Sequence, residues 1–217
     1  MTTPMGSRSF CWYKRDTGTG VDTILSFEDV SGTYRWTLAI LADESVQAIG
    51  KDAGDATEGE MTSNTAVTAV GAWEHLGIAY NPSSTTGRLV VVDGSSQTIA
   101  TNTVAAEDIT VNLDTGFLAA RETGTDAWDG PLSEVVVVTG MLTLTQIQEA
   151  YNSGTPIDPR SLSFGSRVVS HWIASKAEYV ATDDLLAFRN IAPILNQTWG
   201  YADAIGVDST NIDTDVP

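Results

Sequence analysis

Large apolar residues occupy every second position of residues 34–40, the clearest alternating pattern in the chain. A period of two predicts a β-strand with one buried face. Residues 9–15 are predicted to form an earlier strand of the same kind, with Phe10 and Trp12 on one face. Residues 21–27 are predicted to form the next strand, after a Gly/Thr-rich turn. Short strands separated by turn formers are typical of an all-β protein.

One stretch predicts the hairpin around which the other strands are arranged. Two apolar runs, residues 73–80 and 89–92, flank residues 81–87, nearly all of which preset or tolerate turn dihedrals. Asp93-Gly94 then ends the second strand in a tight turn, because Gly accepts a positive φ without steric cost. A hairpin cannot bury both of its apolar faces alone, so the remaining strands must cover it.

Two further segments follow different patterns. Four consecutive valines at positions 135–138 predict a strand covered on both faces, as in the middle of a sandwich. Residues 51–64 carry four acidic residues and two glycines without periodicity, which predicts an exposed loop or flap.

The best-defined local element is a short capped helix. Thr143 and Gln146 have the spacing of a capping box, and Leu142 and Ile147 have that of a hydrophobic staple. Gly154 follows the last turn, where a C-terminal glycine is expected. We expect little other helix in the chain.

These elements, in this order, resemble the concanavalin A-like jelly rolls, specifically their laminin-G-like and pentraxin-like branch. The first motif is Trp73-x-His75 at the start of a hairpin that ends in Asp-Gly. The second is the aromatic residue, acidic residue and glycine that lead into the valine strand, and the third is the capped helix after that strand. The resemblance implies an all-β, concanavalin A-like (laminin-G-like) jelly-roll β-sandwich with one short helix, spanning residues 1–155.

Residues 156–217 differ in composition and are predicted to be a C-terminal extension that begins with a Pro-containing linker. They resemble the extension that follows such jelly rolls in tailed-bacteriophage virion proteins, down to the terminal Asp-Val-Pro. Residues 167–173 predict a strand and residues 183–190 a helical turn, and residues 203–217 carry four aspartates and no basic residue.

The apolar pieces of this extension are short, so a segment of its length would be marginal as an independent fold. The chain also begins directly at its Phe-Cys-Trp strand, whereas members of the family usually have an earlier edge strand. We therefore expect residues 167–173 to pair at that free sheet edge or with an adjacent subunit, while the acidic end stays outside.

Charge and composition narrow the functional classes. The chain has 28 acidic and 11 basic residues and a net charge of −17, which argues against a nucleic-acid-binding footprint. No apolar run approaches the ~18 residues of a membrane span, and the N-terminus lacks a signal-peptide pattern. The single cysteine, Cys11, excludes an internal disulfide framework and is interpreted as a small apolar strand residue.

The chain lacks the residue patterns of the common hydrolases. A glucanase on this fold needs two carboxylates on one strand face, and the nearest candidate, Glu58-Gly59-Glu60, falls in the predicted loop. His75 is predicted to be a packed strand residue beside Trp73 rather than a general base. We therefore expect no enzymatic activity, and in particular no glycan hydrolysis.

Jelly-roll lectins stack sugars on exposed aromatic residues and hold calcium with rim carboxylates, so glycan binding stays open. The loop cluster of Trp128 with Asp126 and Asp129 is the candidate ligand site. We expect no cofactor, with weak or absent dependence on calcium. Three tryptophans on strand patterns are predicted to be core: Trp12, Trp36 and Trp73.

The leading hypothesis is a non-enzymatic structural protein of a bacteriophage virion, either a capsid decoration or a tail or fibre surface protein, acting by adhesion and assembly. Its partners would be other virion proteins and copies of itself, not nucleic acid or a membrane. The alternative is a lectin-like carbohydrate-binding module that contacts host glycans. Head and tail locations are both compatible with the sequence.

Overall fold

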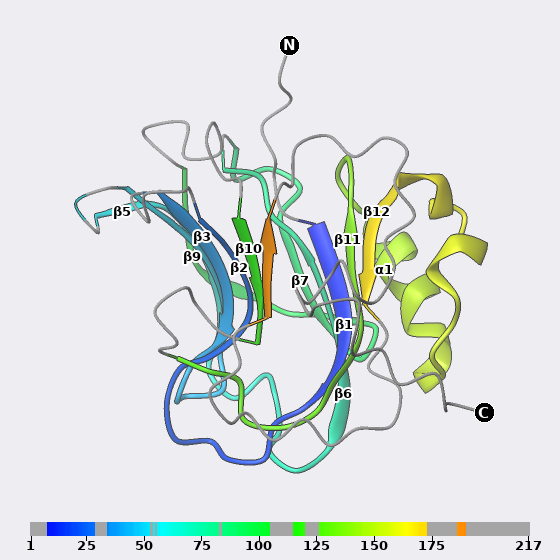
Figure 1. Cartoon of the computed structure of the whole chain (residues 1–217), viewed down its shortest axis with the longest axis horizontal. Helices are drawn as coiled ribbons and strands as arrows, with labels where there is room; N and C mark the ends of the chain where they lie inside the picture. Colours follow the sequence, from blue (N-terminus) through cyan, green and yellow to red (C-terminus); the bar gives the residue numbers. More distant parts are fainter. Residues whose placement is uncertain are drawn as a thin grey trace, which may run out of the picture.

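Two antiparallel β-sheets lie face to face in the computed structural model, and a helix covers the outer face of one of them (Figure 1). The structure describes residues 8–28, 34–52, 54, 56–82, 84–104, 116–119 and 126–172, together with the backbone of 115 and 186–189. Over these residues the expected all-β jelly-roll sandwich with one short α-helix is confirmed.

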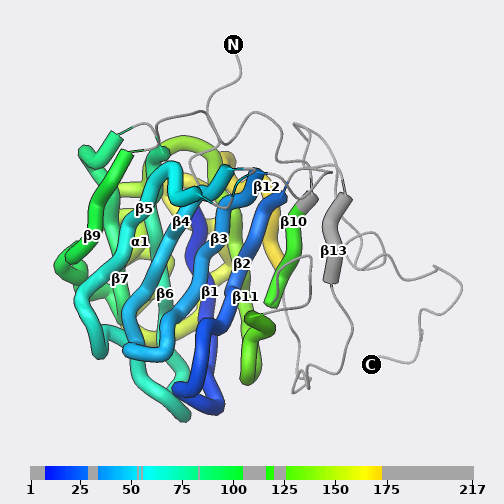
Figure 2. Tube along the Cα trace, turned by 90° about the vertical axis from the view of Figure 1, so that its left-hand side faces the viewer, coloured from blue at the N-terminus to red at the C-terminus, as the bar shows by residue number. Residues whose placement is uncertain are grey.

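The two sheets have six and seven strands. The six-stranded sheet has the spatial order β12 (Val168–Trp172), β11 (Leu132–Val138), β1 (Arg8–Lys14), β6 (Trp73–Ala79), β7 (Leu89–Val92), β8 (Ser95–Ser96). Figure 2 shows the seven-stranded sheet face-on, in the order β13 (Leu186–Arg189), β10 (Thr115–Leu118), β2 (Asp22–Glu28), β3 (Arg35–Ile40), β4 (Val46–Lys51), β5 (Thr57–Ser63), β9 (Ile99–Thr103).

The predicted central hairpin is confirmed as β6 and β7. The two strands pair antiparallel, with Leu76 opposite Val92 and Ala79 opposite Leu89. Asp93 and Gly94 both adopt positive φ values, 47° and 73°, and lead directly into β8. Two consecutive left-handed residues are the geometry of the tight hairpin turn that an Asp-Gly pair favours.

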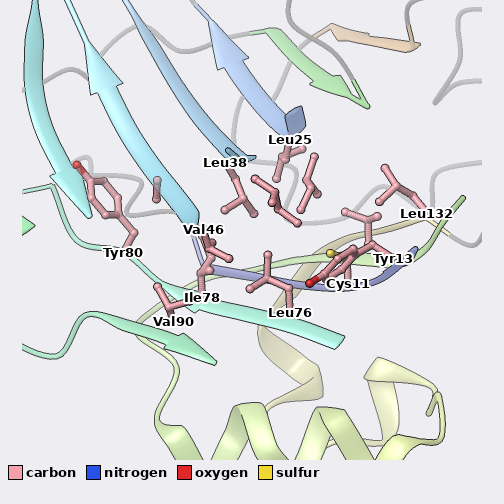
Figure 3. Close-up of a cluster of buried hydrophobic side chains, with 14 of the residues drawn as sticks. Cys11, Tyr13, Leu25, Leu38, Val46, Leu76, Ile78, Tyr80, Val90 and Leu132 are labelled. Atoms are coloured by element: carbon pink, nitrogen blue, oxygen red, sulfur yellow. The ribbon is translucent and has the colours of Figure 1, made fainter. Parts of the chain in front are cut away.

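The alternating pattern of residues 34–40 also predicts the observed burial. Trp36, Leu38 and Ile40 are each at most 2% exposed and lie in the core between the sheets. Figure 3 shows this core, in which side chains of both sheets meet, Cys11 and Tyr13 among them. Cys11 is a buried free thiol whose pKa is raised to about 12 by burial, in agreement with its interpretation as an apolar strand residue.

The valine strand β11 is covered on both faces, as predicted. Val135 and Val137 belong to the core between the sheets, whereas Val136 and Val138 belong to a second cluster on the outer face of the six-stranded sheet. Helix α1 (Leu144–Tyr151) covers that second cluster. The protein therefore has three layers: seven strands, six strands and a helix.

Both predicted N-terminal caps of α1 are present. The Thr143 hydroxyl accepts a hydrogen bond from the Gln146 backbone N–H at 3.3 Å, and the Thr143 N–H donates to Gln146 Oε1 at 3.0 Å. Leu142 and Ile147 are both buried in the outer cluster, where the staple places them. The C-terminus differs from the prediction, because Asn152 takes the left-handed cap with φ 45° and the 3₁₀ turn Asn152–Gly154 follows.

Two segments that were predicted to be a loop and a helical turn contain β-strands instead. The segment interpreted as a loop, residues 51–64, contains β5, which pairs with β4 and β9. The segment interpreted as a helical turn, residues 183–190, contains β13, which pairs with β10. In both segments pairing to a neighbouring strand supplies the backbone hydrogen bonds that the local sequence does not specify.

The segment that follows α1 continues the outer layer and then joins a sheet. Leu162 and Phe164, between the short 3₁₀ turns Pro159–Ser161 and Gly165–Arg167, are buried in the outer cluster. β12 then pairs antiparallel with β11 as the edge strand of the six-stranded sheet, the kind of position expected for residues 167–173. The acidic residues 203–217 lie outside the described residues. The division into residues 1–155 and an extension of 156–217 stays a prediction.

Candidate functional site

The predicted ligand residues lie in the loop between β10 and β11, but Trp128 points into the core. Its side chain is 2% exposed and packs edge-on against Tyr13, with ring centroids 5.5 Å apart. The backbone N–H of Trp128 donates to the Ala119 carbonyl at 2.8 Å. A buried indole has no face for a sugar ring, so the expectation of an exposed loop tryptophan is corrected.

The two carboxylates of the same loop lie nearer the surface. Asp129 is exposed, and its Oδ2 accepts a hydrogen bond of 2.7 Å from the Thr17 hydroxyl. Asp126 has a left-handed backbone with φ 54°, and its carbonyl accepts a 2.8 Å hydrogen bond from the Thr23 N–H. The structure thus gathers the three residues in one loop without forming a joint surface. Their ligand-binding role stays a prediction.

A buried ion pair lies under this end of the sandwich. Arg15 is fully buried, and its Nε donates to Asp22 Oδ2. Its other nitrogens donate to the carbonyls of Leu41 at 3.1 Å and Gly20 at 2.9 Å. Burial raises the pKa of Asp22, an effect that the hydrogen bond from Arg15 opposes. Arg15 thereby joins the segment after β1 to the start of β2 through Asp22 and to the loop after β3 through the Leu41 carbonyl.

The prediction that Trp73 is a core residue is also wrong. The side chain is 50% exposed at the start of β6. Leu76 and Ile78 point between the sheets, so alternation turns Trp73 and His75 to the outer face. Tyr151 of α1 packs on His75, with ring centroids 5.8 Å apart, and Trp73 lies two residues further towards the strand end. The alternation along β6 could be read from the sequence, but how far α1 extends over the outer face of that strand could not.

His75 is packed as predicted. It is fully buried, and rings of Phe10, Trp12 and Tyr151 have centroids 5.8, 5.1 and 5.8 Å from its own. Burial lowers the pKa of His75 to about 3, so its imidazole is neutral at physiological pH. Neither ring nitrogen has a hydrogen-bond partner. A histidine enclosed by aromatic rings cannot reach a substrate and does not act as a general base.

A polar groove of about 480 Å³ lies on the seven-stranded sheet, where β4, β5 and β9 meet the turn between β3 and β4. Gln47 Nε2 donates to Glu60 Oε1 at 2.9 Å, and the Thr62 hydroxyl donates to the same oxygen at 2.6 Å. Asp43 Oδ1 accepts hydrogen bonds from the N–H and hydroxyl of Ser45, which lower the pKa of Asp43. The groove is lined by Leu41, Asp43, Ser45, Gln47, Glu60, Thr62, Ser63, Asn64, Thr65, Ala100 and Thr101.

Glu58-Gly59-Glu60 therefore belongs to a strand and not to a loop. Alternation places Glu58 and Glu60 on one face of β5, although only Glu60 lines the groove. The interpretation of residues 51–64 as an irregular loop left this groove unpredicted. The recoverable signal was the Glu-x-Glu-x-Thr alternation of residues 58–62.

The described ranges show neither a metal-binding cluster nor a membrane-spanning helix. No group of three or more His, Cys, Asp or Glu side chains there is arranged to hold a metal ion. In the same part of the chain, no helix is long and apolar enough to cross a membrane.

Comparison with known proteins gives a family match. Residues 9–148 match a laminin-G-type model of the concanavalin A-like lectin/glucanases superfamily. No curated protein sequence matches the chain significantly.

Several solved structures share the fold. A heptameric SAP-like pentraxin from Limulus polyphemus aligns with TM-score 0.50 and 14% identity, covering 85% of this chain and 83% of the pentraxin. A tailspike protein of an Escherichia coli O157:H7 bacteriophage aligns with TM-score 0.50 and 18% identity over 80% of this chain. A leech intramolecular trans-sialidase aligns with TM-score 0.50 and 11% identity over 70% of this chain. The alignment covers 24% of the tailspike and 24% of the trans-sialidase.

Proposed function

The chain belongs to the concanavalin A-like lectin/glucanases superfamily, and on this premise we propose that it is a non-enzymatic adhesion domain that binds glycans through its polar groove. The observation that carries the proposal is the fixed set of polar side chains on β4 and β5. Gln47 donates one of its two amide N–H groups to Glu60 Oε1, and Thr62 donates its hydroxyl to the same oxygen. This leaves the second Gln47 N–H, Gln47 Oε1, Glu60 Oε2 and the lone pairs of the Thr62 hydroxyl for a ligand.

Such a set suits the hydroxyl groups of a sugar. Acceptors held by rigid strands bind without losing much side-chain entropy, which is the usual limit on weak polar binding. Leu41 and Ala100 add apolar contacts to the groove lining. Amide, hydroxyl and carboxylate groups beside small apolar surfaces are the donors and acceptors that orient a bound molecule in a shallow site.

The charge of the groove selects among glycans. Asp43 and Glu60 are the charged residues of its lining, which includes no Lys or Arg. A net charge of −17 over the whole chain adds to the negative potential. Uncharged sugars or amino sugars are therefore the preferred ligands, and sugars that carry a carboxylate would be repelled.

Binding fits this groove better than hydrolysis does. A glycosidase needs one carboxylate as acid and a second as nucleophile or base across the scissile bond. Glu60 Oε1 already accepts two hydrogen bonds, and Asp43 is held by Ser45 in a turn. Both groups are oriented by neighbours of their own, as expected for recognition.

The setting that we propose for this adhesion domain is the surface of a tailed-bacteriophage virion, with copies of itself and other virion proteins as partners. Support comes from the resemblance of residues 156–217 to virion-protein extensions and from the fold shared with a phage tailspike. β12, the edge strand of the six-stranded sheet among the described residues, offers a backbone for strand addition by a neighbouring subunit.

Affinity electrophoresis of the full chain in gels containing dextran, mannan or a soluble β-glucan tests the glycan proposal. Gln47→Ala is expected to weaken retardation about tenfold, the loss of one well-placed hydrogen bond. Gln148→Ala, an exposed glutamine on α1, is the matched control and should bind like the wild type. Equal binding by both variants, or hydrolysis of a polysaccharide by the wild type, would contradict the proposal.

A further inference from the structure

The exposed indole of Trp73 lies on the six-stranded sheet, the opposite sheet from the groove. We infer that the exposed indole of Trp73, with Lys14 and Asp16 beside it, stacks on one ring of an uncharged saccharide. The inference rests on the proposed glycan binding only in its ligand class, because it uses a separate surface and different residues. Trp73 is the most exposed large apolar side chain among the described residues, at 50%.

The strand on either side of Trp73 is held in place. The next residue, Glu74, accepts a 2.7 Å hydrogen bond from the Tyr13 hydroxyl and a 2.9 Å hydrogen bond from the Ala69 N–H. The His75 N–H donates to Asp93 Oδ1 at 2.8 Å. β6 also has a strand on each side, β1 and β7. The indole therefore projects from a rigid base, and ordering it around a ligand costs little entropy.

Donors and acceptors lie at the same end of the six-stranded sheet as Trp73. Lys14 stands opposite Trp73 in the pairing of β1 with β6, so the two side chains share the outer face. Lys14 Nζ lies 3.6 Å from Asp16 Oδ1. The Asp16 N–H donates to the Asp129 carbonyl, and Asp129 Oδ2 accepts from the Thr17 hydroxyl. Lys14 therefore supplies hydrogen-bond donors, and Asp16 and Asp129 supply acceptors, near the start of β6.

This combination matches a sugar ring. A pyranose presents an apolar C–H face that packs on an aromatic ring, and a rim of hydroxyl groups that both donate and accept. Lys14 balances only one of the two aspartates, Asp16, so this surface keeps a small negative charge that favours an uncharged ring over an anionic one.

The same surface is too polar for a stable protein interface. A standard interface buries about 800 Å² on each partner around an apolar centre. Val70, 42% exposed, is the nearest exposed large apolar residue in sequence. The others lie elsewhere: Val21 precedes β2, Val104 follows β9 and Val169 belongs to β12. One aromatic ring bordered by charged side chains is the size of a sugar subsite.

Two subsites on one domain would raise the avidity for long or dense glycans. The groove and Trp73 lie on different sheets, joined by the loop 64–72 between β5 and β6. A single short oligosaccharide would occupy one surface, whereas a polysaccharide coat could engage both.

The test compares Trp73→Ala with wild type in the same dextran, mannan and β-glucan gels, and uses 5-fluorotryptophan labelling with ¹⁹F NMR of the full chain. We expect Trp73→Ala to weaken binding to a polysaccharide at least tenfold at an unchanged melting temperature, and Trp73→Tyr to retain most of it. The ¹⁹F signal lost in Trp73→Ala should be the one that shifts most when polysaccharide is added. Val169→Ala is the control for loss of an exposed apolar side chain.

The outcomes separate this inference from the proposed function. Weaker binding in Gln47→Ala together with unchanged binding in Trp73→Ala would overturn the Trp73 surface alone. A wild-type chain that binds none of the three polysaccharides would overturn both. A change of oligomeric state in Trp73→Ala without a change in glycan affinity would identify a protein contact and would also overturn it.

Discussion

Gly77 of β6 lies directly beneath Ile147 of α1. A Cβ atom added to Gly77 would come within 2.2 Å of Ile147 Cγ2. The helix therefore rests on bare backbone in the middle of the six-stranded sheet. This close approach seats a short helix over a sheet that would otherwise expose Phe10 and Val136.

Gly77→Ala is expected to destabilise the protein by about 1–3 kcal/mol, because the new methyl group overpacks a filled interface. Urea unfolding measures the change. Gly54→Ala is the matched control, since the added Cβ there meets only Asp52 Oδ1 at 3.4 Å. Adding Ile147→Leu, which removes Cγ2, should recover part of the loss. Wild-type stability in Gly77→Ala would show that the helix is seated elsewhere.

Trp128→Ala tests whether this residue is part of the core. We expect a loss of about 3–5 kcal/mol, as for other buried aromatic side chains, because the cavity beside Tyr13 cannot close. Asp129→Asn, in the same loop but exposed, should leave the unfolding midpoint unchanged. A stable Trp128→Ala variant with impaired glycan binding would instead restore the loop-site hypothesis.

His75 is expected to make stability depend on pH. Its pKa falls from 6.5 to about 3 on folding, so the unfolded chain binds the proton more readily. The contribution of neutral His75 to the free energy of unfolding is complete above pH 6.5 and is lost as the pH falls towards 3. The loss is roughly 1.4 kcal/mol for each pH unit.

In His75→Leu this dependence should flatten between those two pH values. Unfolding free energies at several pH values, measured with urea for both proteins, give the comparison. Parallel pH profiles would mean that the pKa of His75 is the same in the folded and unfolded chain, in conflict with its aromatic enclosure.

Deleting residues 160–217 should destabilise the sandwich strongly. The deletion removes edge strand β12 and the buried side chains of Leu162 and Phe164. Loss of a buried aromatic residue alone costs about 3–5 kcal/mol, a large share of the ~5–15 kcal/mol that stabilises a typical domain. We expect a lower melting temperature and aggregation, followed by differential scanning fluorimetry and light scattering.

A shorter deletion of residues 190–217 keeps β12, β13 and the outer cluster, and serves as the comparison. If the longer deletion melts and associates like the full chain, residues 160–172 are a passive tail, and the assembly part of the proposal loses its support.

Elements that depend on neighbours in sequence could be predicted. The alternation of residues 34–40, the Asp93-Gly94 turn and the capping box of Thr143 and Gln146 are all present as expected. Each is encoded within a few residues, by side-chain period, by permitted backbone dihedrals or by a local hydrogen bond.

The strands β5 and β13 could not be predicted in this way. Gly59 and the acidic residues around it have low intrinsic strand propensity, and β5 forms because β4 and β9 pair with it on both sides. The alternation of Glu58, Glu60 and Thr62 is readable in the sequence, but the polar groove also needs residues of β4 and β9, and that pairing is not encoded locally.

The sequence by itself determined a sandwich of alternating strands, a capped helix and an acidic surface. Only the tertiary structure decided which tryptophan faces solvent. Trp128 comes from a loop and is buried because the loop folds over Tyr13, whereas Trp73 comes from a strand and is exposed because α1 ends at Tyr151 over His75. Local pattern specifies which face of a strand a side chain takes, but burial depends on what the rest of the chain lays over that face.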